Sequence, residues 1–72
     1  MYKPHTITFR KEDLPKAMEI TMKHEGDFDK IIRGVVGIGD SRQEITFKFY
    51  PYIEEDFVKL KNEFIKEGIQ II

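Results

Sequence analysis

The 72-residue chain contains no cysteine and no tryptophan, and it has a single serine and a single asparagine. The absence of cysteine excludes disulfide bonds and thiolate metal sites. The longest apolar stretches fall far short of the roughly 20 residues that a membrane-spanning helix needs, so we expect no membrane partner. The N-terminus has no hydrophobic block of the kind that signal peptides carry, and the expected location is the cytoplasm.

The charge balance lacks an excess of either sign. Twelve basic and 13 acidic side chains give a formal net charge of −1, whereas a general nucleic-acid binder usually shows a basic excess. Hydrophobic residues make up 40% of the chain and aromatic residues 12%, which is typical of a folded protein and not of a disordered one. A chain of this length is expected to form one domain over residues 1–72.

The chain does contain a regular change of hydrophobic period. Two-residue alternation predicts four strands, the last of them short, over residues 5–10, 30–38, 44–50 and 69–72. Helical spacing predicts two helices between them, which begin near Asp13 and Glu54 and end at Gly26 and Gly68. Turn residues at 39–41 separate the second and third strands, which should therefore form an antiparallel hairpin.

This order of elements predicts an α+β fold of the ferredoxin-like split βαβ type, with the element order βαββαβ. The sheet would be antiparallel and four-stranded, in the order 4-1-3-2, with both helices on one face. An alternative keeps the first five elements and leaves the tail disordered or bound to a partner. Because this fold supports many unrelated activities, it says little about function.

The alternation also predicts which side chains face the helices. Phe47 and Phe49 should point inward, as should Ile32 in the second strand, while Ile31 should lie near the edge of the outward face. The outward face is then the surface that remains available for binding. We expect it to bind a partner through these residues: Thr6, Thr8, Arg10, Arg33, Val35, Thr46, Lys48 and Tyr50.

No catalytic or cofactor motif accompanies the fold pattern. The only serine, Ser41, lacks a nearby histidine to act as its base. The glycine-containing segment 34–39 leads into a turn and not into the helix that would bind a phosphate. Asp27 and Asp29 could offer oxygens to a hard cation, but an EF-hand would need further ligands. We therefore predict no enzyme activity, no cofactor and no metal, and the question of a cation at Asp27 and Asp29 stays open.

The expected function is that of a small non-enzymatic protein-binding module, a regulator or inhibitor acting through the open sheet face or a strand edge. Its partner would be another protein, and a homodimer would be one form of this. The alternative is a single-stranded nucleic-acid-binding protein that uses the same face, as some split βαβ domains do through outward aromatic residues. On the third strand, alternation turns only Tyr50 outward, while Phe47 and Phe49 point inward and could not stack on bases. This alternative therefore ranks second.

Overall fold

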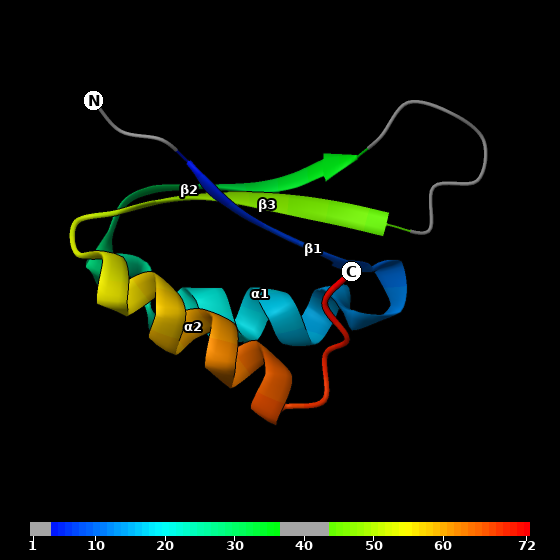
Figure 1. The fold of residues 1–72 in the computed structure, drawn as a ribbon. Coiled ribbons are helices and arrows are strands. Elements are labelled where there is room, and N and C mark those ends of the chain that lie inside the picture. Colours follow the sequence, from blue (N-terminus) through cyan, green and yellow to red (C-terminus); the bar gives the residue numbers. More distant parts are fainter. Residues whose placement is uncertain (1–3, 37–43) are drawn as a thin grey trace.

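The computed structural model describes residues 4–36 and 44–72 of the chain (Figure 1). These residues form three strands and two helices, with short 3-10 turns on either side of the first helix: β1 (His5–Arg10), α1 (Leu14–Lys23), β2 (Phe28–Val36), β3 (Glu44–Pro51) and α2 (Glu54–Lys66). The fold is α+β, as predicted. The predicted end of the second strand at Ile38 and the turn at 39–41 lie outside the described residues.

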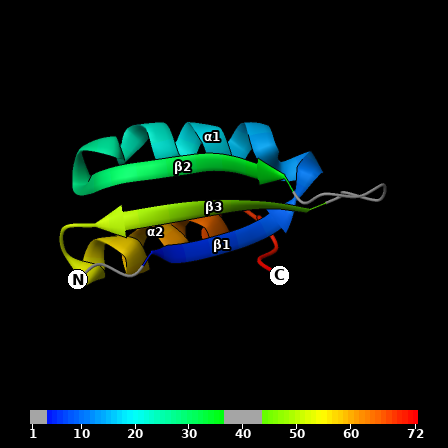
Figure 2. The same cartoon turned by 90° about the horizontal axis from the view of Figure 1, so that it is seen from above.

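The strands form an antiparallel sheet in the order β1-β3-β2, so β3 is the central strand (Figure 2). Both helices cover the same face of the sheet, which confirms the predicted one-sided arrangement (Figure 1). The predicted fourth strand is not confirmed. Residues 69–72 make one antiparallel bridge, between Ile71 and Phe9, and the N–H of Ile72 donates to the carbonyl of Thr8 at 2.9 Å.

The pairing of β1 with β3 is continuous over six residue pairs, from His5 opposite Phe49 to Arg10 opposite Glu44. β-Branched and aromatic residues favour such a pleated ribbon, and successive side chains point to opposite faces. Phe47 and Phe49 are fully buried on the helix side. The predicted inward direction of these two aromatics is therefore confirmed.

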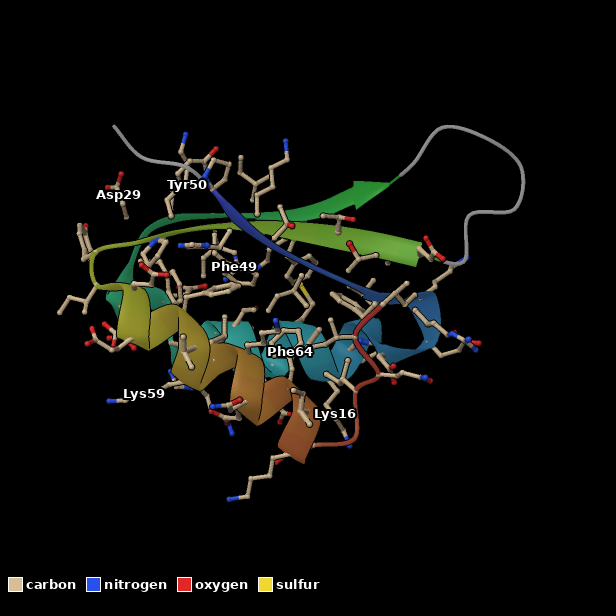
Figure 3. The ribbon with its side chains drawn as sticks, in the orientation of Figure 1. Lys16, Asp29, Phe49, Tyr50, Lys59 and Phe64 are labelled. Carbon is tan, nitrogen blue, oxygen red and sulfur yellow. The ribbon has the colours of Figure 1, made fainter. Side chains whose placement is uncertain are left out.

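The core between sheet and helices is built largely from aromatic rings. All six phenylalanines of the chain are buried in one hydrophobic cluster, and Figure 3 shows Phe49 and Phe64 between the two layers. Neighbouring phenylalanine rings have centroids 5.1 to 6.2 Å apart in edge-on or tilted orientations. Each such pair adds about 0.5–1.5 kcal/mol beyond the burial of area, so this cluster supplies much of the stability of a short chain.

The two helices end differently. At the end of α2, Gly68 has a φ of +90°, its N–H donates to the carbonyl of Ile65, and the N–H of Ile69 donates to that of Phe64. This is a Schellman motif, and it confirms Gly68 as the stop. The prediction for Gly26 is wrong: α1 ends at Lys23, and a 3-10 turn follows before any left-handed residue is needed. Among the described residues, neither helix is long and apolar enough to cross a bilayer.

The second strand departs from simple alternation. Its register against β3 shifts between Phe28 and Lys30 and again between Ile32 and Val35, so β2 carries an extra residue at each place. Gly34, in the second shift, has a φ of +75°, which glycine adopts at little cost. Because parity changes at a bulge, the predicted sides of Ile31 and Ile32 are wrong: Ile31 lies opposite Phe49 against the core, and Ile32 lies opposite Lys48.

Candidate docking face of the sheet

The sheet face opposite the helices has no second layer over it in the part of the chain that the structure describes (Figure 1). We call this surface the open face. Strand register and alternation assign it the following side chains: Thr6, Thr8 and Arg10 from β1, Glu44, Thr46, Lys48 and Tyr50 from β3, and Lys30 and Ile32 from β2. They come from three strands and form cross-strand rows, which are the natural contact units of a sheet.

Lys48 is at the centre of the open face. It belongs to the central strand and has Thr6 opposite it on β1 and Ile32 opposite it on β2. Lys48 and Ile32 are half-buried, and Thr6 is exposed. Lys48 makes no ion pair with any described residue. The central position is therefore a cation set between a hydroxyl and an aliphatic side chain, without a carboxylate opposite it.

Thr8 and Thr46 form the next row. Their hydroxyl oxygens lie 2.8 Å apart and share a hydrogen bond, and the backbone register places Val35 opposite Thr46 on the other side. Cross-strand threonine pairs of this kind contribute about 0.2–1 kcal/mol to a sheet. The row is thus neutral and satisfied within itself.

Tyr50 and Lys30 form the row on the other side of Lys48. The ammonium of Lys30 lies over the Tyr50 ring, 5.1 Å from its centroid, in a cation–π arrangement. Figure 3 shows Tyr50 on the side of the sheet away from the helices, with Asp29 near it at the margin. Lys30 makes no ion pair with Asp29 or with another described residue. This row offers a partner a cation and the exposed part of an aromatic ring.

Seven of the eight predicted partner-binding residues have backbone positions that match the open face. They are Thr6, Thr8, Arg10, Val35, Thr46, Lys48 and Tyr50. Arg33 is the exception. It lies on the helix side, where its Nη2 is 2.6 Å from Oε2 of Glu25 and its Nε–H donates to Oγ1 of Thr21 at 3.3 Å.

The displacement of Arg33 has the same cause as the reversal of Ile31 and Ile32. The register shifts of β2 change the parity of residues 30–33, and a count from uninterrupted alternation misassigns all of them. On the helix side Arg33 satisfies a buried hydroxyl: Thr21 donates to the carbonyl of Met18 at 2.9 Å and accepts from Arg33. Arg33 therefore links β2 to α1 in the fold.

The same parity change brings two unpredicted residues, Lys30 and Ile32, to the open face. The glycine at position 34 is the only signal in this stretch that could have indicated a bulge. Glycine inside a strand also fits a close backbone approach, and space around Gly34 is open. Gly34 therefore permits a bulge that reverses the side-chain directions in β2, but the sequence alone does not establish one.

One cluster of charged side chains on the helix side is paired across the two helices. His24, at the end of α1, has its Nε2 2.7 Å from Oε1 of Glu63 on α2, and Lys23 lies 3.8 Å from the same carboxylate. The hydrogen bond from His24, aided by the positive charges of His24, Lys23 and Lys66, lowers the pKa of the Glu63 carboxyl below its ordinary value. This cluster joins the two helices at their surface.

The acidic connection after α1 does not assemble a metal site in the described residues. No group of three or more suitable ligands is found in residues 4–36 and 44–72. Asp27 lies 3.5 Å from Nδ1 of His24, while Asp29 belongs to β2. An open hollow of about 250 Å³ is lined by Asp29 together with Glu25, Phe28, Lys30, Ile31 and Arg33. Two of its charged residues, Glu25 and Arg33, already pair with each other.

Comparison of the chain with known protein families, with curated proteins and with solved structures finds no match.

Proposed function

We propose that this protein is a small non-enzymatic protein-binding module, a regulator or inhibitor that docks a protein partner through its open face. The observation that supports the proposal is the contrast at the centre of the sheet. The half-buried basic side chains on the helix side, His24 and Arg33, are paired with carboxylates, whereas half-buried Lys48 makes no ion pair with a described residue and lies beside half-buried Ile32. Tyr50, half-buried on the same face, is of a residue type that is enriched in protein–protein interfaces.

A second copy of the chain is the less favourable occupant of this face. Two copies stacked face to face about a two-fold axis would bring their centres together. The two Lys48 side chains would then approach each other without a carboxylate between them, and such like-charge contacts oppose association. A homodimer that uses the open face is therefore ranked below a complex with a different protein.

Single-stranded nucleic acid is the second candidate, because Lys30, Lys48 and Tyr50 lie together on the face. A base would need a free aromatic ring to stack on. Tyr50 is half-buried, and the ammonium of Lys30 lies over its ring. Stacking would require Lys30 to move away, so a protein partner fits the observed arrangement better.

Site-specific photo-cross-linking tests the docking face. The photoreactive residue p-benzoylphenylalanine is placed at Thr6 on the open face or, as a matched control, at Lys59, an exposed position on α2. In extract from the native host, the Thr6 probe should yield a discrete protein adduct that excess unlabelled wild-type chain abolishes. The Lys59 probe should not. Equal adducts from both positions, no adduct from Thr6, or an adduct made of nucleic acid would reject the proposal.

We also propose the finer fold assignment, the ferredoxin-like arrangement with a fourth strand over residues 69–72. The antiparallel bridge between Ile71 and Phe9 and the hydrogen bond from Ile72 to Thr8 support it, because a fourth strand that paired with β1 would give the order 4-1-3-2. Amide hydrogen exchange checks this assignment. If residues 69–72 form a continuous strand, the β1 amides that point away from β3 should be protected wherever that strand pairs with β1. Protection of the amides near Thr8 alone would count against a continuous strand.

A further inference from the structure

We infer that the partner places a carboxylate against Lys48, so the docking segment is an acidic stretch of a protein. This inference rests on the proposed function, since it concerns the same open face. It adds the chemistry that the partner must bring, and it follows from the surroundings of Lys48.

The position of Lys48 makes its burial unavoidable in such a complex. It lies on the central strand, between Thr6 and Ile32, and it is already half-buried in the free protein. A partner that covers the middle of the sheet removes the remaining water from its ammonium group. Burying an ammonium ion without a compensating charge is costly, so a partner that lacks an anion at this point would be rejected.

The described part of the chain does not place an anion beside Lys48. The cross-strand neighbours of Lys48 are Thr6 and Ile32, which carry no charge. The open-face carboxylate Glu44 is opposite Arg10 in the register, and Asp29 lies at the margin of the sheet, on the same side as Tyr50 (Figure 3). Neither Glu44 nor Asp29 forms an ion pair with Lys48. The complementary charge must therefore come from the partner.

The neighbours of Lys48 describe the rest of the partner segment. Ile32 is half-buried and would contact an aliphatic side chain beside the carboxylate, and Thr6 can accept or donate one hydrogen bond. Lys30 lies on an edge strand and stays at the rim, where a charge affects steering more than affinity. A segment that alternates acidic and aliphatic residues meets these requirements.

The test uses two synthetic peptides and the intact 72-residue chain. One peptide alternates glutamate and leucine, and the other carries glutamine in place of each glutamate. Backbone amide shifts are followed by two-dimensional NMR at low salt. The glutamate peptide should shift the amides of Thr6, Ile32 and Lys48 first, and the glutamine peptide should bind at least about tenfold more weakly, because Lys48 would then be covered without a charge opposite it.

Variants of the chain assign the effect to one side chain. Lys48→Gln should reduce binding of the glutamate peptide to the level of the glutamine peptide, and Lys48→Arg should retain it. Lys59→Gln on α2 removes the same charge from an exposed helical site and should leave binding unchanged. Retained affinity in Lys48→Gln, equal binding of the two peptides, or tighter binding of oligo(dT) at the same amides would overturn the inference.

The outcome for the docking face is separable from the outcome for the carboxylate. If the Thr6 probe still captures its protein partner from the Lys48→Gln chain, the face is used and the inference about the acidic segment is wrong. If Lys48→Gln abolishes that adduct while Lys48→Arg and Lys59→Gln keep it, both statements stand. If the wild-type Thr6 probe captures no protein, the proposed function fails first.

Discussion

The two faces of the central strand β3 differ in every property that matters for stability and binding. On the helix side, Phe47 and Phe49 are completely buried among other phenylalanine rings. On the open side, Thr46 and Lys48 alternate with them at intermediate exposure and lie opposite cross-strand neighbours on β1 and β2. One strand of eight residues thus contributes half of its side chains to holding the fold together and leaves the other half available to a partner.

The comparison shows why one face of the sheet can do without a covering layer from the described residues, 4–36 and 44–72. The aromatic cluster and the two helices concentrate apolar burial on one side, so the other face is not needed for the core. An antiparallel sheet tolerates this arrangement, because its strands can be apolar on one face and polar on the other. Substitutions on the two faces should therefore have effects of very different size.

The largest expected effect comes from Phe47→Ala. Removal of a fully buried ring leaves a cavity in the aromatic cluster and should lower the free energy of unfolding by about 3–5 kcal/mol. The adjacent substitution Thr46→Ala, on the open face, should cost no more than about 1 kcal/mol, for the hydrogen bond to Thr8. Urea denaturation followed by circular dichroism measures both. Similar losses from the two variants would mean that β3 is not one-sided.

The next effect concerns the bulge that determines which side chains of β2 reach the open face. Gly34→Ala places a Cβ on a residue with φ of +75°, and this should destabilise the fold by about 1–2 kcal/mol. Gly26→Ala is the matched control: space is open at both glycines, but only Gly34 has a positive φ. The control should change stability by less than about 0.5 kcal/mol. Equal effects in denaturation would contradict the left-handed bulge.

The helix side should also show a specific dependence on pH. The pKa of Glu63 is lowered in the folded state from an ordinary value of 4.5, so the unfolded chain takes up this proton first as the pH falls. The stabilisation is therefore complete above about pH 4.5 and is lost as the pH falls through the folded pKa. Glu63→Gln should cost about 1 kcal/mol at neutral pH.

The difference between wild type and Glu63→Gln should shrink toward zero as the pH falls below 4.5. Urea denaturation at a series of pH values from 3 to 7 gives this difference directly. A difference that stays constant over the whole series would show that the His24–Glu63 contact does not depend on the ionised carboxylate.

The smallest effect on stability is expected from Lys48→Gln. Lys48 makes no ion pair with a described residue, so its charge should contribute less than about 0.5 kcal/mol to folding. Thermal and urea denaturation should place the variant beside wild type. A loss larger than 1 kcal/mol would assign Lys48 a structural role and weaken its assignment to binding.

The predictability of the fold varied with the regularity of each strand. β1 and β3 pair over six consecutive residues without interruption, so alternation in the sequence corresponds directly to the two faces of the sheet. The stop at Gly68 was also predictable, because the Schellman motif needs a left-handed residue there. The tail was harder to predict, because Ile69 is buried without belonging to a strand. A short, mostly apolar tail does not distinguish a strand from a segment that is buried without regular pairing.

The candidate site was predictable on β1 and β3 and less so on β2. Thr6 and Lys48 follow from alternation alone, whereas Arg33 and Ile32 exchange sides because extra residues in β2 shift the parity. Local propensity does not reveal that shift, since it depends on how β2 pairs with a strand distant in the sequence. The sequence pattern does not identify the partner, because the open face carries no recognisable binding motif; the inference about the partner comes from the side chains around Lys48.

Thiol labelling tests the one-sidedness of the sheet most directly, because the natural chain contains no cysteine. Single cysteines replace two neighbours on β1: exposed Thr6 on the open face and buried Ile7 on the helix side. The Thr6→Cys thiol should react at nearly the rate of a small free thiol, and the Ile7→Cys thiol at least about a hundredfold more slowly, since it must wait for opening of the fold. Equal rates in two folded variants would contradict the covered and open faces on which this account depends.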